Sequence, residues 1–343
     1  KDFKKAAHCQ IHLGKHREAA ELFEKAGKLD KAAKQYETAN DYEAALNLWV
    51  KLEEHSQAAK CLEHLLKYEK AAEYWEKASE YESQAKALEH AGQDRSAAQV
   101  WYKIEEWEQA LRLWIKVEEW LQAGHCFKKM NMHKDAAEMY LKGGDTEGAI
   151  AEYEKIDDYK SLHQIYADAG DNVSALDVLI KGGDLQGAGE FCMKTGMYIE
   201  AEGIWSKLKN NEMLVEVYLK SKNFVKAIQL LHKSGKTSEA YDIWVKHCKD
   251  HDVLMKDVDY VDTLRKIANR LSKENRNTNA IQIWELLEDY RKLASAHEKL
   301  GHLENAATFW RNVGEQETNL SEQIKCFSKA LELNPDEADC YSL

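Results

Sequence analysis

Proline is nearly absent from this sequence, which contains one in 343 residues, at position 335. Because proline interrupts helices and marks turns, its scarcity favours helix along almost the whole chain. The 17 glycines are few enough to agree with this. We expect an all-α fold with more than roughly 70% helix and no sheet.

Long apolar runs, a secretion signal and paired cysteine spacings are absent as well. A membrane helix needs about 18 or more consecutive apolar residues, and no segment approaches that length. The seven cysteines show no paired spacing, which predicts reduced, buried thiols in a cytoplasmic (intracellular) protein. The sequence begins at Lys1 without Met and stops within what resembles another repeat, so we expect a fragment of a larger multidomain protein.

An excess of basic residues is absent, since the formal net charge is −12 and the pI is near 5.7. This argues against nucleic-acid binding by the chain as a whole. The charge is uneven: residues 1–36 hold nine Lys/Arg and five Asp/Glu, a balance of +4, whereas residues 145–202 hold four Lys/Arg and thirteen Asp/Glu, a balance of −9. The acidic stretch could meet a basic partner, or it could be an ordinary solvated surface.

Catalytic motifs are missing from the sequence. It has no G-x-x-x-x-G-K-[ST] loop for a nucleotide and no elbow that would organise a Ser, His and Asp. His8, Cys9 and His12 have metal-like spacing, as do His247, Cys248 and His251, but neither group has the second pair that a closed zinc site needs. We therefore expect no enzyme activity, no cofactor, no metal site and no small-molecule substrate.

A period of thirteen residues is the dominant feature that is present. Eighteen positions in this register, here called the large column, hold thirteen aromatic residues, four Leu and one Cys. The large column is Phe23, Tyr36, Trp49, Leu62, Trp75, Leu88, Trp101, Trp114, Phe127, Tyr140, Tyr153, Tyr166, Leu179, Cys192, Trp205, Tyr218, Leu231 and Trp244. Four residues before each lies a small column of Ala, interrupted only by Gln84, Leu162 and Leu214. A spacing of four puts both columns on one face of a helix.

One continuous helix cannot carry this period, because thirteen residues turn about 220° beyond whole turns and would scatter the large column around the axis. Gly, Asn and Ser recur four residues after the large column, and Asp, Glu or Asn follow at the next position in eleven of the eighteen units. These residues predict a helix end and then a helix start in every unit. Alternate units carry the bulkier side chains, which predicts two-helix hairpins of 26 residues, and about 24 to 26 helices in all.

A column of Lys stands two residues after the large column in fourteen of the eighteen units. The Lys column is Lys25, Lys51, Lys77, Lys103, Lys116, Lys129, Lys142, Lys155, Lys181, Lys194, Lys207, Lys220, Lys233 and Lys246. The Lys column could bind nucleic acid or an anionic surface. Positive charge in the last helical turn also complements the helix dipole, and we favour this structural role for the Lys column.

Aromatic residues also recur in the predicted turns, where they can pack against a neighbouring helix. Two of them, Trp107 and Trp120, are our candidate partner-binding residues, because a Trp at a turn is only partly covered and can anchor a protein interface.

The sequence predicts three segments. Residues 1–246 form the regular array of 26-residue repeats, and residues 247–279 interrupt it with one longer amphipathic helix built on Val258, Val261, Leu264, Ile267, Ala268 and Leu271. Residues 280–343 resume the pairing, with Ala280 before Trp284 and Ala306 before Trp310.

The last segment resembles tetratricopeptide repeats (TPR). Phe327, Ala330, Leu331 and Pro335 stand at the offsets of that family's second helix and closing proline, and residues 336–343 resemble the opening of a further copy. Residues 1–246 are similar to the shorter helical arrays of intraflagellar-transport and coat-type proteins, and to the repeat tails of helicase-like or signalling NTPases. The resemblance implies a right-handed superhelical α-solenoid that binds a protein or peptide.

Our leading hypothesis for function is a non-catalytic scaffold or recognition module for other proteins. One alternative is the sensor or architectural repeat tail of a helicase-like or signalling NTPase. The other is binding of nucleic acid or an anionic surface through the Lys column, although we do not expect nucleic acid as the main partner and expect no membrane span.

Overall fold

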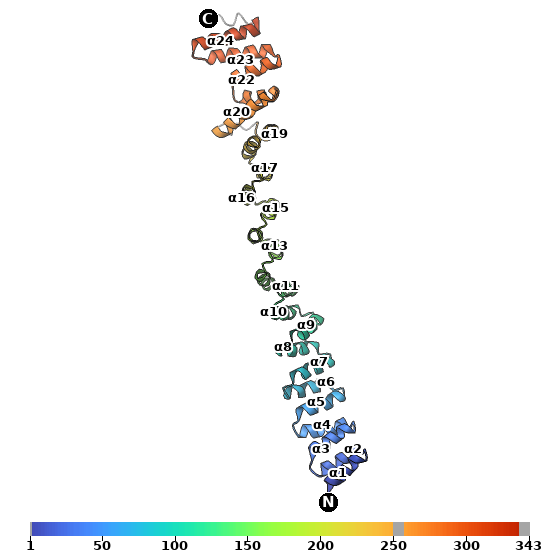
Figure 1. The fold of residues 1–343 in the computed structure, drawn as a ribbon. Helices are drawn as coiled ribbons and strands as arrows, with labels where there is room; N and C mark the ends of the chain where they lie inside the picture. Colours follow the sequence, from blue (N-terminus) through green and yellow to red (C-terminus); the bar gives the residue numbers. More distant parts are fainter. Residues whose placement is uncertain (1, 250–256, 336–343) are drawn as a thin grey trace. The chain divides into compact units, whose positions relative to one another are not determined.

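The computed structural model describes residues 2–249 and 257–335. Within these ranges the chain forms 24 α-helices and no strand, and the fold is 79% helical (Figure 1). The predicted all-α array of short tandem helices is confirmed. The helices group into two compact units, residues 1–178 and 179–343, with the boundary inside α14.

The helices are short, and most contain ten residues. The first fourteen are α1 Phe3–His12, α2 His16–Lys25, α3 Leu29–Thr38, α4 Tyr42–Lys51, α5 His55–His64, α6 Tyr68–Lys77, α7 Tyr81–His90, α8 Asp94–Lys103, α9 Trp107–Lys116, α10 Trp120–Lys129, α11 His133–Lys142, α12 Thr146–Lys155, α13 Tyr159–Asp168 and α14 Asn172–Lys181. The other ten are α15 Leu185–Thr195, α16 Tyr198–Lys207, α17 Asn211–Lys220, α18 Phe224–Lys233, α19 Thr237–His247, α20 Val258–Lys273, α21 Asn277–Leu286, α22 Tyr290–Leu300, α23 Leu303–Gln316 and α24 Leu320–Leu333.

Both predicted packing columns lie inside. All eighteen small-column residues are buried, including the exceptions Gln84, Leu162 and Leu214. Fourteen large-column residues are buried, and the remaining four are half-buried: Phe127, Tyr166, Leu179 and Tyr218. A helix of ten residues is not stable alone in water, so burial of each large side chain against a neighbour, worth about 1.5 to 3 kcal/mol, stabilises the array.

The turns between helices follow one pattern. The residue four positions after the large column has a positive φ in seventeen of the eighteen units, and only Cys248, at φ −125°, differs. The next backbone N–H then donates to the carbonyl of the large-column residue, as Lys28 N does to Phe23 O at 2.9 Å. This is the Schellman arrangement that ends helices. The large-column residue therefore packs with its side chain and closes the turn with its carbonyl.

The acidic residues that follow each turn divide into two kinds. Asp and Asn cap the next helix with their side chains, as Asp41 does by accepting from Ala44 N at 3.3 Å. Glu54, Glu80, Glu106 and Glu119 make no such bond, so the prediction of a capping role is wrong for the glutamates. Glu carries one more methylene than Asp, which puts its carboxylate past the nearby N–H groups that the shorter side chain reaches.

Consecutive helices pair in an antiparallel way, and alternate helices place their N-termini together. The first residue of one helix contacts the last residue of the next, as the ring of Tyr42 does by stacking on His64 at 4.2 Å. Between alternate helices, residues 24 positions apart bridge: Ser56 Oγ donates to Glu80 at 2.7 Å, and Lys67 Nζ lies 3.5 Å from Glu43. Gln93 and Glu69 form a third bridge of this kind, so the contacts recur every thirteen residues and each helix repeats those of the helix before it.

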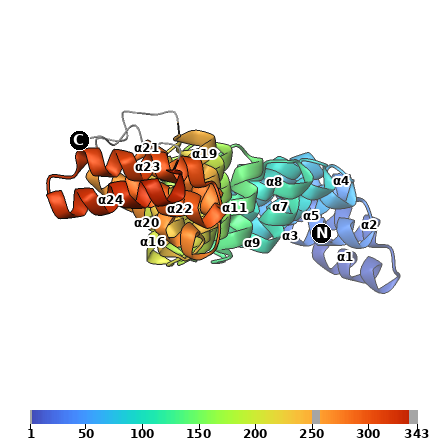
Figure 2. The same ribbon diagram turned by 90° about the horizontal axis from the view of Figure 1, so that it is seen from above.

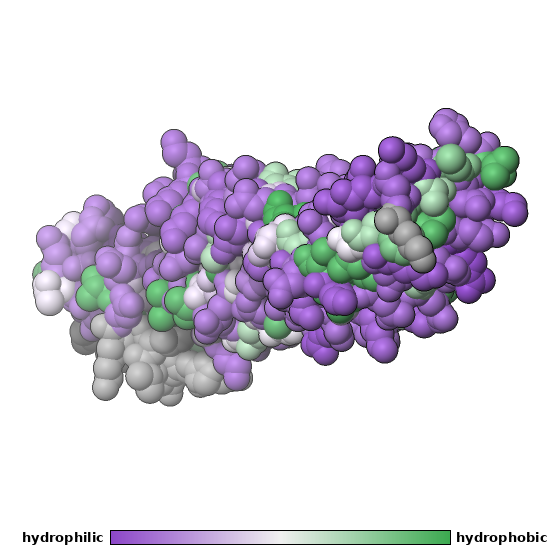
Figure 3. All heavy atoms as spheres, turned by 90° about the horizontal axis from the view of Figure 1, so that it is seen from below, coloured by the Kyte–Doolittle hydropathy of each residue, from purple (hydrophilic) through white to green (hydrophobic). Residues whose placement is uncertain are grey.

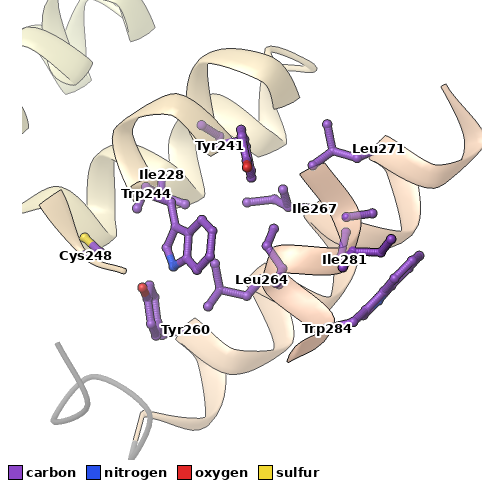
Figure 4. Close-up of a cluster of buried hydrophobic side chains, with 14 of the residues drawn as sticks. Ile228, Tyr241, Trp244, Cys248, Tyr260, Leu264, Ile267, Leu271, Ile281 and Trp284 are labelled. Atoms are coloured by element: carbon purple, nitrogen blue, oxygen red, sulfur yellow. The ribbon is translucent and has the colours of Figure 1, made fainter. Parts of the chain in front are cut away.

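The predicted interruption contains the longest helix, the 16-residue α20. Its Leu264, Ile267, Ala268 and Leu271 are buried and pack with Trp244 of α19 (Figure 4). Val258, expected on the same face, is 79% exposed because it is the first residue of α20, and Tyr260 fills the core in its place.

The C-terminal helices α22, α23 and α24 lie side by side in Figures 1 and 2. Of the residues that resemble TPR positions, Ala330 is buried, and the ring of Phe327 lies against Gly314, 2.6 Å from the point where a Cβ would stand. Pro335 follows the end of α24. The predicted further copy, residues 336–343, lies outside the described residues.

Candidate partner-binding surface

The tryptophans of the large column in the first unit are structural residues. The indole Nε1 of Trp49 donates to Glu37, that of Trp75 to Glu63 and that of Trp101 to Glu89, each at 2.7 Å. Each Glu directly follows the large-column residue of the preceding helix. A buried indole N–H needs an acceptor, so these pairs tie each helix to its neighbour. The sequence analysis missed these pairs, although a Glu twelve residues before a large-column Trp can be recognised in the sequence.

Where that Glu is missing, the indole lacks an acceptor. The buried Nε1 atoms of Trp114, Trp205 and Trp284 have no hydrogen-bond partner among the described residues. The residues at the corresponding offset are Tyr102, Met193 and Ser272. A Glu twelve residues before the Trp therefore distinguishes the tryptophans whose indole N–H is hydrogen-bonded from those that are held by packing alone.

Trp107 and Trp120 are half-buried, each as the first residue of its helix, α9 or α10. Lys129 Nζ lies 5.8 Å from the ring centroid of Trp107, and Lys142 Nζ lies 5.4 Å from that of Trp120. Because α9 and α10 are antiparallel, their first residues lie at opposite ends of the pair. The structure does not bring the two tryptophans together, and both are in contact with the chain's own lysines.

The Lys column lies at helix ends, as the dipole argument predicts, since twelve of its fourteen members are the last residue of their helix. Several also contact the first residue of the preceding helix. Lys103 Nζ lies 4.2 Å from the ring centroid of Tyr81, and Lys116 Nζ lies 2.7 Å from Asp94. Such contacts are worth roughly 0.5 to 1 kcal/mol at exposed sites.

Glu152 of α12 is fully buried, although nothing in the repeat pattern marks it. Its carboxylate lies 2.8 Å from Lys155 Nζ, 3.1 Å from Lys128 Nζ and 2.7 Å from His133 Nδ1. Burial alone would raise the pKa of Glu152, but the hydrogen bonds from these three side chains outweigh it and hold the pKa at about 2. The group joins α10, α11 and α12.

A groove of about 490 Å³ lies beside α11, α12 and α13 in the first unit. Its apolar lining comes from Leu141, Tyr153, Ile165 and Ala169. Its polar lining comes from Thr146, Ser161, Gln164 and Asp168. The volume falls within the range of binding pockets, and one large side chain of a ligand fits such a space. The sequence did not predict this site.

The predicted histidine groups serve other contacts. His8 packs edge-on to Phe23, with ring centroids 5.4 Å apart, and His247 stacks on Phe224 at 4.2 Å. His251 lies outside the described residues. Among residues 2–249 and 257–335, no three His, Cys, Asp or Glu side chains are placed to hold a metal ion.

The cysteines inside the array are thiols shielded from solvent. Burial raises the pKa of Cys61 to about 12 and those of Cys126 and Cys192 to about 11. Low thiolate content makes such residues poor nucleophiles and poor metal ligands. Cys9, in contrast, is exposed.

Hydrophilic side chains predominate on the face seen in Figure 3, with narrower hydrophobic areas between them. In the described part of the chain, no helix combines the length and apolar character needed to cross a bilayer.

No protein-family model and no curated protein matches the chain. Among solved structures, the chain is similar to the TPR domain of P58(IPK), with 16% identity, coverage of 95% of this chain and 99% of the other, and a TM-score of 0.22. Yeast Tom70 matches with 12% identity, coverage of 99% and 96%, and a TM-score of 0.24. The Cut9-Hcn1 complex of APC/C matches with 12% identity, coverage of 98% and 94%, and a TM-score of 0.19.

Proposed function

We propose that this chain is a non-catalytic, intracellular scaffold that recognises segments of other proteins. The observation that supports this most directly is the groove beside α11, α12 and α13, where Leu141, Tyr153 and Ile165 provide apolar walls. A groove with apolar walls and a few polar groups is the usual form of a site for a peptide side chain. The buried columns join the helices to one another, and the remaining surface is available to partners.

The contacts of the Lys column are the reason for preferring a protein partner to a polyanion. Lys103, Lys129 and Lys142 lie over aromatic rings of the chain, and Lys116 pairs with Asp94. A nucleic acid would have to displace these contacts and approach a chain of net charge −12.

Photo-cross-linking in native cells tests the proposal. Benzoylphenylalanine replaces one surface residue at a time, in the first unit at Leu66, Met132 or Gln164 and in the second at Ile199, all of which are exposed. We expect at least one position to give a saturable protein adduct that excess unlabelled chain suppresses. Adducts to nucleic acid alone, or no saturable protein adduct at any position, would contradict the scaffold function.

A further inference from the structure

The groove beside α11, α12 and α13 arises at a change in the repeat. In most units of the first half, the residue after the small column is also small, as in Ala136-Ala137, and both are buried. In the next three helices this second position holds Ile150, His163 and Leu176. Such side chains take more room between helices than Ala does, and the groove lies in the same part of the chain, beside α11, α12 and α13.

The polar groups at this groove have one sign of charge. Its lining contains Asp168 and no Lys, Arg or His. Tyr153, which forms a buried wall, has its pKa raised mainly by burial and further by the negative charges of Glu138 and Asp158, while its contact with Ser161 acts in the other direction. Asp168 therefore lines the groove, and two further carboxylates, Glu138 and Asp158, act on its tyrosine wall.

These carboxylates differ from Glu152 in their partners. Glu152 is paired with Lys128, Lys155 and His133. Among the described residues no cation pairs with Asp158, which accepts from Ser161 N at 3.1 Å, or with Asp168, which accepts from Gln164 Nε2 at 2.7 Å. The chain thus pairs the carboxylate that is buried between helices with cations, and it leaves Asp168 at the groove and the nearby Asp158 without one, within a stretch whose charge balance is −9.

We propose that this groove binds a short segment of a partner protein in which an apolar side chain is flanked by Lys or Arg. The apolar side chain enters between Leu141, Tyr153 and Ile165, and the cation lies beside Asp168. The proposal rests on the proposed function, because it names the class of segment that the scaffold recognises. Charge complementarity selects this occupant over an acidic segment, which the uncompensated carboxylates repel.

Fluorescence anisotropy with two defined peptides tests the inference on the full chain. One labelled peptide of about twelve residues carries leucines flanked by lysines, and the other has the same leucines flanked by glutamates. We expect the basic peptide to bind, with affinity that falls as salt rises, and the acidic peptide to bind at least about tenfold more weakly.

Two variants with the same charge change locate the binding. Asp168→Lys should weaken the basic peptide at least about tenfold, whereas Glu108→Lys, an exposed substitution on α9 outside the groove, should change the affinity less than about twofold. Asp168→Asn removes the charge with little change in shape and should give an intermediate loss. Circular dichroism confirms that each variant remains helical.

A second pair tests the apolar walls. Leu141→Gln should weaken the basic peptide about fivefold, and Leu66→Gln, at an exposed leucine outside the groove, should leave it unchanged. Equal effects of Asp168→Lys and Glu108→Lys, or no binding of the basic peptide at all, would overturn the inference. Neither result would affect the scaffold function, which a saturable cross-link at Leu66, Met132 or Ile199 establishes independently.

Discussion

The indole ring of Trp205 lies directly over Gly189 of the preceding helix, 2.5 Å from the point where a Cβ of residue 189 would stand. We expect Gly189→Ala to lower the free energy of unfolding of the second unit by about 1 to 3 kcal/mol, because the added methyl group overlaps the ring. Urea denaturation followed by tryptophan fluorescence measures the change.

Gly203→Ala is the matched control for this substitution. Gly203 is also helical, but nothing lies within 4 Å of its hypothetical Cβ. The same Gly to Ala change should therefore raise the free energy of unfolding by up to about 1 kcal/mol through helix propensity. If both substitutions shifted stability in the same direction, the close approach of Trp205 would not be the cause.

Leu66 occupies the turn position at which half of the eighteen units place Gly or Asn, and its φ is +57°. A non-glycine residue in the left-handed region costs roughly 1 to 2 kcal/mol. The Leu66 side chain is 71% exposed, so little packing offsets this cost. Leu66→Gly should raise the free energy of unfolding by about 1 kcal/mol, whereas Leu66→Ala removes the side chain without relieving the backbone and should not stabilise. Chemical denaturation compares the two.

The sequence predicts the regular part of the fold because one position performs several tasks. Trp75, for example, recurs at a spacing of thirteen, packs against the neighbouring helix and accepts the turn hydrogen bond at its carbonyl. When one position serves both packing and the turn, the same type of residue recurs there in every repeat, and this period can be recognised in the sequence. The helix ends, the buried columns and the Lys position could therefore be predicted without coordinates.

The irregular features could not be predicted in the same way. Glu152 differs from the exposed Glu154 only in the direction that its side chain takes relative to two neighbouring helices. The groove is lined by residues of three helices, among them Leu141, Tyr153 and Ile165, and no single position of the repeat marks them. Trp107 and Trp120 were predicted as partner-binding residues from their place in the turns, and this stays a prediction. Each ring already contacts a lysine of the chain, Lys129 or Lys142, which a partner would have to displace.

The large column and the Lys column should differ in their weight for stability. Trp75→Ala should cost about 3 to 5 kcal/mol, since the ring is buried and its Nε1 bonds Glu63. Lys77→Gln removes a contact with the ring of Tyr74, at 4.7 Å, and should cost less than about 1 kcal/mol. Hydrogen exchange should show the damage from Trp75→Ala concentrated in α5, α6 and α7, because each repeat contacts mainly its neighbours. If the two substitutions lowered the free energy of unfolding equally, the assignment of the large column to the core and of the Lys column to the surface would be wrong.

The buried carboxylate of Glu152 should make the first unit sensitive to acid. Its pKa in the folded chain is about 2, below the ordinary value of 4.5 that applies when the chain unfolds. A carboxyl whose folded pKa is depressed contributes stability that is complete above its unfolded pKa and is lost as the pH falls from about 4.5 toward 2. Between pH 7 and pH 3 this loss amounts to about 2 kcal/mol.

Urea denaturation at pH 7 and pH 3 measures the contribution when the native chain is compared with Glu152→Gln. The variant should be less stable at pH 7, because Lys128 and Lys155 lose their anion, and it should lose about 2 kcal/mol less than the native chain on acidification. Glu147→Gln, at an exposed residue of the same helix α12, removes one carboxylate without touching this cluster and serves as the control. An identical response to acid in the native chain and Glu152→Gln would show that the three contacts do not hold the carboxylate in its charged form.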